Sequence, residues 1–236
     1  MKLQRKGTRH SHRGVIGVES AIVMIAFVIV AAALAFVVLN MGFTTSQKAK
    51  TTIISSLDEV SSSMQMAGKV TAIGCTSTGT CSTTPALNAT IFPIKITTGG
   101  APVDLDVSTT AVKYLSNSVE YDDIYAGPIT AAEYRSANSA FTRADAETGS
   151  DFDAFNGVNY LGSPSSTKAF IYWSVRSNTN AILDQGEHAA LAIGYALADR
   201  PASLDSIRME IIPATGASLS VDRQVPAITR SVVDLG

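Results

Sequence analysis

An uninterrupted apolar stretch near the amino terminus constrains this chain more than any other feature. Ala21 to Leu39 are nineteen consecutive apolar residues, and no charged residue occurs from Ser20 through Gln47. Nineteen such residues are enough for an α-helix to cross the hydrocarbon core of a bilayer. The twelve Ile, Val, Leu and Phe residues of the run favour insertion by roughly 4–7 kcal/mol, against about 3 kcal/mol for a carboxylate at the membrane centre. Glu19 lies at the end of the run, so insertion remains favourable.

The helix is predicted to continue beyond the membrane. Apolar residues recur at three- and four-residue steps between Ile53 and Ala67, which is the spacing of an amphipathic helix. No proline precedes Pro85, so we expect one helix over residues 15–68. About fifty helical residues would measure about 75 Å, more than twice the hydrocarbon thickness. The apolar run also exceeds the 7–15 residues of an ordinary secretory signal, so we expect the mature protein to retain it.

After residue 68 the sequence changes to short β-branched runs separated by glycine-containing turns. This texture predicts an antiparallel, Ig-like β-sandwich of about seven to nine strands over residues 69–236. The expected fold class is therefore α+β, a long hydrophobic helix followed by a sandwich. Residues 137–162 lack clear periodicity and are predicted to form a long surface loop, in which Phe152, Phe155 and Tyr160 pack back on the domain.

Charge is divided unevenly along the chain, because the amino-terminal segment is basic and the remainder is acidic. Residues 1–14 carry five of the 18 Lys and Arg residues and no acid, and the remainder carries 13 basic and 20 acidic residues, a balance of −7. Because no basic cluster follows Lys50, nucleic acid is not an expected partner. No nucleophile-elbow, zinc-protease, P-loop or dinucleotide motif occurs, and His188 is the one histidine outside the first fourteen residues. We therefore expect no enzymatic activity and no cofactor.

Both ends of the chain carry a family resemblance. RGVIGVESAIVMIAFVIVAAALAFVVLNMGFTTSQKAK (residues 13–50) resembles the start of archaeal flagellins, the archaellins, within the wider class of type IV pilins. SIRMEIIPATGASLSVDRQVPAITRSVVDLG (residues 206–236) is similar to their carboxyl terminus, whereas residues 70–165 show the weakest likeness. The resemblance implies a filament subunit that is made as a membrane-inserted precursor with a short basic leader.

The leader implied by this resemblance is residues 1–14. A membrane aspartyl peptidase would read Arg13 and Gly14 on the cytoplasmic side and cut before Val15, and cleavage after Gly17 is the alternative. Gly17 then becomes the third mature residue and Glu19 the fifth, where type IV pilins place an acidic residue. The Glu19 carboxylate could pair with the new amino group of a neighbouring subunit, because an unpaired charge in an apolar bundle costs several kcal/mol. Alternatively, it lies at the headgroup level without a partner.

The implied function is structural. The helix, residues 15–68, would form the core of the extracellular archaellum filament on the cell surface, with residues 69–236 outside it. Expected partners are copies of this chain, paralogous flagellins, the preflagellin peptidase, the archaellum motor and export machinery, and the membrane before assembly. Two alternatives remain, an adhesive type IV pilin and a single-pass surface protein that binds a ligand without polymerising.

Two short motifs in the outer region predict covalent modification. Cys75 and Cys81 are close in sequence, and in an exported protein such a pair forms a disulfide loop unless both remain free thiols. Asn88-Ala89-Thr90 is a sequon for N-glycosylation, and the alternative is a chance occurrence.

An acidic segment offers candidate metal ligands. The oxygens of Asp151, Asp153 and Asn156 could bind Ca²⁺, although they lack the spacing and glycine of an EF-hand loop. The alternative is a solvated acidic loop.

Overall fold

A computed structural model describes the chain in five stretches, residues 13–61, 64–75, 85–147, 151–158 and 162–236. The side chains of residues 13–16 and 58–61 are outside this description. The chain divides into two compact units with a boundary between Ser55 and Ser56, and each unit is described by itself.

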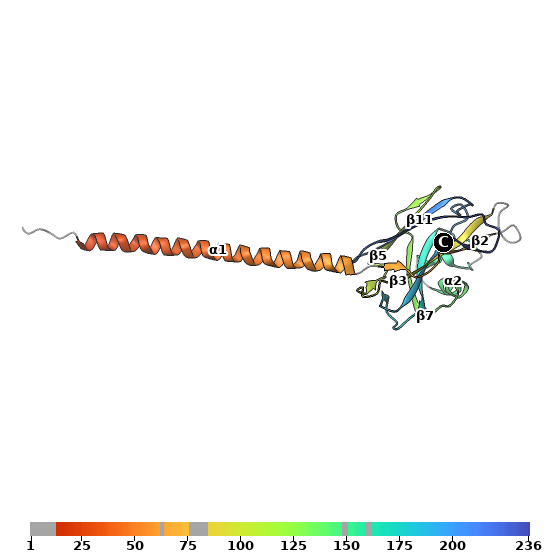
Figure 1. The fold of residues 1–236 in the computed structure, drawn as a ribbon, viewed down its shortest axis with the longest axis horizontal. Helices are drawn as coiled ribbons and strands as arrows, with labels where there is room; N and C mark the ends of the chain where they lie inside the picture. The colour runs from red at the N-terminus through yellow and green to blue at the C-terminus, as the bar shows by residue number, and fades with distance from the viewer. Residues whose placement is uncertain (1–12, 62–63, 76–84, 148–150, 159–161) are drawn as a thin grey trace, which may run out of the picture. The chain divides into compact units, whose positions relative to one another are not determined.

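The first helix, α1 (Arg13–Ser61), has 49 residues and is drawn in Figure 1 as one unbroken helix. At 1.5 Å per residue it is about 74 Å long. The predicted continuation of this helix to residue 68 is wrong, because Met64–Met66 form strand β1, which pairs with β3. Met64 is buried in the domain core, and serines at 61–63 are weak helix formers, so sheet pairing overrides the apolar spacing.

The larger of two main sheets has seven strands in the order β13-β2-β3-β10-β8-β7, with β1 also on β3. Its strand pairs are antiparallel except β7–β8, which is parallel. The expectation of a wholly antiparallel sandwich is therefore corrected at this one pair. Its strands are β1 (Met64–Met66), β2 (Thr71–Cys75), β3 (Ala86–Ile96), β7 (Tyr125–Glu133), β8 (Lys168–Val175), β10 (His188–Gly194) and β13 (Val232–Asp234).

The smaller main sheet has four strands in the order β12-β11-β5-β6, and a separate two-stranded pair joins β4 to β9. Thirteen strands in the described residues exceed the predicted seven to nine, since several have only two or three residues. The strands are β4 (Val103–Asp104), β5 (Thr110–Ser116), β6 (Glu120–Tyr121), β9 (Ile182–Leu183), β11 (Ser206–Pro213) and β12 (Leu219–Gln224).

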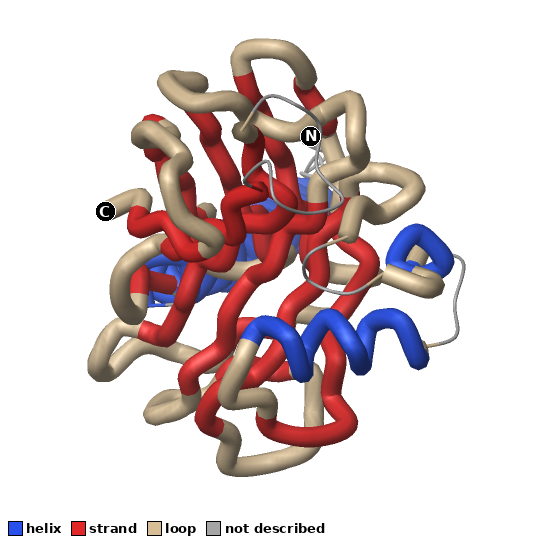
Figure 2. The backbone as a smooth tube through the Cα atoms, turned by 90° about the vertical axis from the view of Figure 1, so that its right-hand side faces the viewer, coloured by secondary structure: helices blue, strands red, loops and turns tan. Residues whose placement is uncertain are grey.

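The predicted loop at 137–162 instead contains two helical segments, α2 (Ala137–Ala146) and the 3₁₀ helix η1 (Phe152–Phe155). Ser136 caps α2 by accepting a hydrogen bond from the backbone N–H of Ser139. The blue helix at the lower front of Figure 2 is α2, which lies across strands of the larger sheet. Phe155 is fully buried, and Phe152 packs against the same cluster, as predicted, whereas Tyr160 lies outside the described residues.

The larger sheet is consequently buried on both faces, in three layers. Along β8, Ala169, Ile171 and Trp173 join the cluster shared with the smaller sheet, whereas Phe170 and Tyr172 join the cluster under α2 and η1. The sequence does carry a helical signal here, because Ala140, Phe141 and Ala144 recur at helical spacing after the capping Ser136.

Candidate assembly surface

The exposed surface of α1 is the feature that most directly bears on function. Every described side chain from Val18 to Leu57 is exposed, and nineteen of them are large hydrophobic residues, up to 73% exposure at Phe27. The described remainder of the chain exposes only six. Within the described residues one helix, Gly17–Leu57, is long and apolar enough to cross a membrane. Since apolar surface in water costs about 25 cal/mol per Å², α1 requires an apolar environment.

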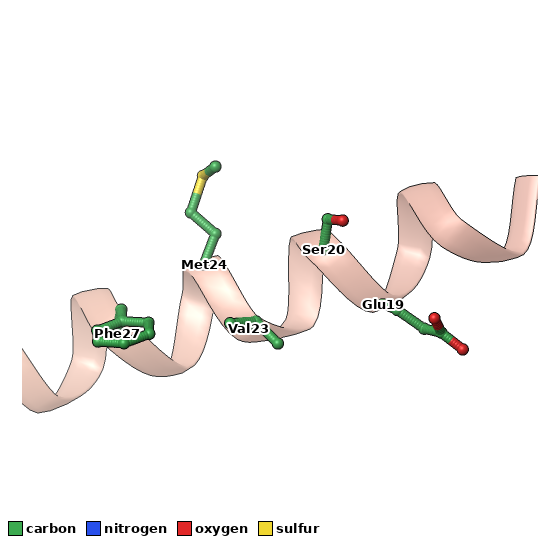
Figure 3. A pocket seen from close by; sticks show the side chains of 5 residues that line it. All are labelled: Glu19, Ser20, Val23, Met24 and Phe27. Carbon is green, nitrogen blue, oxygen red and sulfur yellow. The ribbon is translucent and has the colours of Figure 1, made fainter. Parts of the chain in front are cut away.

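Glu19 lies at the start of this surface. It shares a helix face with Val23 and Phe27, four and eight residues later, whereas Figure 3 shows Ser20 and Met24 projecting from another side. These five side chains line a shallow hollow to which α1 alone contributes. The exposed carboxylate is therefore accessible to a group on another molecule that packs against α1.

The predicted processing residues come just before Glu19. Arg13, Gly14 and Val15 begin α1, and leader residues 1–12 lie outside the described part of the chain. Apart from Gly17 itself, its two chain neighbours and the nearby helix backbone, no described atom comes within 4 Å of the position that a Cβ at Gly17 would occupy. The fold of one chain therefore gives no packing reason for glycine at 17. The cleavage and assembly roles of these residues stay predictions.

A polar segment follows the apolar run of α1, and four of its hydroxyl groups form hydrogen bonds within the helix. Thr44, Thr51, Thr52 and Ser55 each donate a hydrogen bond of 2.9 Å to the carbonyl oxygen four residues earlier. These groups can be buried against another helix without leaving an unpaired donor. This property was not predicted, although Ser and Thr in a helix interior are the signal for it.

The structure gives no support to the expected glycan on Asn88. Asn88 is 1% exposed, and it lies in β3 at a β-bulge, where the register with β2 shifts between Ile73 and Gly74. Thr90 of the sequon is also buried and accepts a hydrogen bond of 2.9 Å from the Tyr195 hydroxyl. A glycan on Asn88 would have to displace its buried neighbours in the sheet, and glycosylation there stays a prediction.

Cys75 ends β2, is buried and is disulfide-bonded. The Arg200 guanidinium approaches its sulfur, with 4.0 Å between Nη1 and Sγ. Cys81 lies outside the described residues. The Cys75–Cys81 pairing therefore stays a prediction.

The three candidate calcium ligands lie together around η1, and the Asp151 carboxylate already has a protein partner. Asp151 forms a salt bridge of 3.0 Å with Lys168, and the carbonyl oxygen of Asp153 accepts a hydrogen bond from the Asn156 N–H. No group of three or more His, Cys, Asp and Glu side chains in the described residues could hold a metal ion. The structure adds no support for a calcium site there.

A buried carboxylate, Glu187, was not anticipated. It is 1% exposed and accepts four hydrogen bonds, from the Trp173 indole and from the backbone N–H groups of Ser177, Asn178 and Asp184. His188 begins β10 half-buried, consistent with its predicted place at a strand entry. These contacts give Glu187 a structural task, closing the connection between β8 and β10.

The outward face of the smaller sheet carries paired charges. Arg208 and Asp222 lie on adjacent strands with 2.8 Å between Nη2 and Oδ2, and Lys113 contacts Asp122 at 2.9 Å. Hydrogen bonds from Arg208 and Ser206 lower the pKa of Asp222. These exposed pairs make the face polar, in contrast to α1.

The comparisons with known sequences agree with the fold. A family model for archaeal-type flagellin matches residues 14–223. "Probable flagellin 1" of Aeropyrum pernix is 34% identical over 230 residues, which cover 95% of this chain and 98% of that protein. "Probable flagellin 2" of Archaeoglobus fulgidus is 35% identical over 114 residues, covering 48% of this chain and 55% of its own length.

Two solved structures share the fold. The archaeal flagellum of Methanospirillum hungatei strain JF1 matches with a TM-score of 0.59 and 20% identity, over 93% of this chain and 99% of that chain. The crystal structure of archaeal flagellin FlaB1 from Methanocaldococcus jannaschii matches with a TM-score of 0.54 and 16% identity, over 73% and 95% of the two chains. The predicted helix followed by a mostly antiparallel sheet domain is thereby confirmed. Because the family match and the Aeropyrum relative both extend over most of its length, the chain belongs to the archaeal-type flagellin family.

Proposed function

We propose that this chain is the structural subunit of an archaellum filament, polymerising through α1 to serve swimming motility. The observation that carries this proposal is the apolar surface of α1, exposed over its described length from Val18 to Leu57. A helix of this kind is not stable alone in water, and identical helices can bury each other's apolar surface. The second unit has its own cores and is free to form the outer part of the filament.

The precursor is stored in the membrane before assembly. Its α1 then exchanges lipid for neighbouring helices, so the apolar surface is covered in both states. The internally bonded hydroxyls of Thr44, Thr51, Thr52 and Ser55 extend the surface that can be covered in this way. The motor and export machinery supply energy, and this chain transmits torque without an enzymatic activity of its own.

Processing prepares the amino end of α1 for contact with another subunit. Removal of residues 1–14 by the preflagellin peptidase creates an amino group on Val15, one helical turn or about 6 Å before Glu19. The carboxylate of one subunit then pairs with the amine of a neighbour displaced by about one turn along the filament. Without this pair, a charge enclosed among the helices would cost several kcal/mol.

Filaments sheared from cells provide the test. We expect electron microscopy to show fibres of this chain and amino-terminal sequencing to begin at Val15. A first residue of Val18 would instead assign cleavage after Gly17. Monomeric protein that keeps Met1 would contradict the proposed function. A deletion strain should lose swimming and keep surface adhesion, and the reverse would identify an adhesive pilin.

The role of Glu19 is tested by Glu19→Gln. We expect normal leader removal and little or no filament, since the neutral amide cannot neutralise the amine. Glu120→Gln is the matched control, because it makes the same chemical change at an exposed position of the outer unit. Normal filaments from the Glu19 variant would contradict the pairing.

A further inference from the structure

The turn before β11 contains a residue in a strained conformation. Leu204 has a φ of 75°, and no other non-glycine residue in the described stretches has a positive φ. Asp205 N–H donates to the Ala202 carbonyl, so Leu204 occupies the third position of a four-residue turn, where glycine or asparagine is usual. In this left-handed backbone region the side chain of leucine clashes with the backbone, which is energetically unfavourable.

The strained turn is held rigidly. The Leu204 N–H donates to the Val225 carbonyl at 2.8 Å, and the Val225 N–H donates to the Asp205 carbonyl at 2.8 Å. The Asp205 carboxylate accepts from the Ala202 N–H at 2.8 Å and from the Asn117 amide at 3.1 Å. A turn fixed in this way loses little freedom on binding.

The side chain that this turn presents is apolar and faces solvent. Leu204 is 71% exposed, more than any other large hydrophobic side chain described in the second unit. Leu204 therefore combines a backbone conformation that leucine disfavours with an apolar side chain exposed to water. Strain of this kind is characteristic of contact sites.

A complementary surface lies elsewhere on the same unit. A groove of about 410 Å³ runs between the larger sheet and the start of α2, and its lining includes the apolar side chains of Ile91, Tyr134 and Val232. Arg135 is exposed in this lining, and no salt bridge in the described part of the chain includes it. The groove is thus apolar with a cation at its margin, whereas the turn is apolar beside the carboxylate of Asp205.

We propose that Leu204 of one subunit inserts into this groove of a neighbouring subunit, with Asp205 next to Arg135. The inference rests on the proposed polymerisation and adds a contact between outer units to it. Because the turn and the groove are different surfaces, each copy can donate to one neighbour and receive from another. Such a heterologous contact extends into an open helical array instead of closing as a dimer.

The test compares assembly and folding of the full-length chain. Leu204→Asn should raise the subunit concentration required for assembly by roughly 10- to 100-fold, the loss expected from one buried leucine. In detergent, at a protein concentration that keeps the chain monomeric, the melting temperature of the outer unit should stay the same or rise, because asparagine tolerates a positive φ. Leu197→Asn is the matched control, an exposed leucine at 65% with no positive φ, and should change assembly less than twofold.

Arg135→Glu identifies the receiving surface. It should weaken assembly on its own, and the combination with Leu204→Asn should weaken it by less than the product of the two single effects. Independent effects, an equal loss from Leu197→Asn, or unchanged assembly of Leu204→Asn would each overturn the proposal. Weaker assembly with a lower melting temperature in detergent would assign Leu204 a folding role and also overturn it. Absence of filaments from the wild-type chain would instead refute the proposed function.

Discussion

The substitution Glu187→Gln is expected to destabilise the outer unit strongly. Each carboxylate oxygen of Glu187 accepts two hydrogen bonds, one oxygen from the N–H groups of Ser177 and Asn178 and the other from Trp173 and Asp184. Glutamine replaces one oxygen with an NH₂ group. Whichever way the amide is oriented, that NH₂ faces two donors, so a flip of the side chain cannot restore the bonds.

The magnitude follows from the two bonds that are lost. A hydrogen bond to a charged group contributes about 1.5–3 kcal/mol, so the free energy of unfolding should fall by roughly 3–6 kcal/mol. This is a large part of the 5–15 kcal/mol typical of a whole domain. The substitution therefore tests whether Glu187 contributes a large part of the stability of the β8–β10 connection.

Urea unfolding in detergent, followed by fluorescence, measures the effect. Trp173 is the only tryptophan in the chain, is fully buried and donates to Glu187, so its emission reports on this site. With a slope of about 1–3 kcal/mol per molar urea, the midpoint should fall by at least about 1 M. The control Glu120→Gln should stay within about 0.5 kcal/mol of wild type. A loss below about 1 kcal/mol for Glu187→Gln would refute the reasoning.

Two further perturbations have expected outcomes. Gly74→Ala would place a Cβ 2.7 Å from the Arg230 carbonyl oxygen, so the urea midpoint should fall clearly, whereas Gly68→Ala meets only an ordinary 3.7 Å contact and should behave as wild type. The pKa of Asp222 is lowered by hydrogen bonds including that from Arg208, so its contribution to stability is present above its ordinary pKa of 3.8 and is lost as pH falls through the lower folded value. Urea titrations from pH 6 to pH 2 should therefore show a smaller decrease in the free energy of unfolding for Arg208→Gln than for wild type. An equal decrease in both proteins would contradict this reasoning.

The apolar helix was predictable because every position from Ala21 to Leu39 carries the same signal. The strand-rich second unit was also predictable as a class, since alternation and turn residues recur along it. Strand direction was not, because period-two alternation is the same in parallel β7–β8 as in an antiparallel pair. The end of α1 was also missed, because an apolar spacing of three and four residues at 64–67 does not reveal pairing with β3.

Within the candidate site, exposure was the property that sequence alone could not supply. The sequon at Asn88 matches a glycosylation motif letter by letter, yet its side chain is buried at a bulge. By contrast, α2 left a readable signal, a capping Ser136 followed by Ala140, Phe141 and Ala144 at helical spacing. The four internal hydroxyl bonds of α1 required knowing that the helix continues through Ser55.

The separation of the hydrophobic cores has a consequence for how a subunit changes its surroundings. Both cores are built from Met64 onward, and none of the described side chains of α1 belongs to either. The globular part can therefore keep the same internal packing whether α1 lies in lipid or among other helices. In the proposed assembly, transfer of α1 from lipid to the filament would change the surroundings of one helix and would need no refolding of the outer unit, so the same step could be repeated for every added subunit.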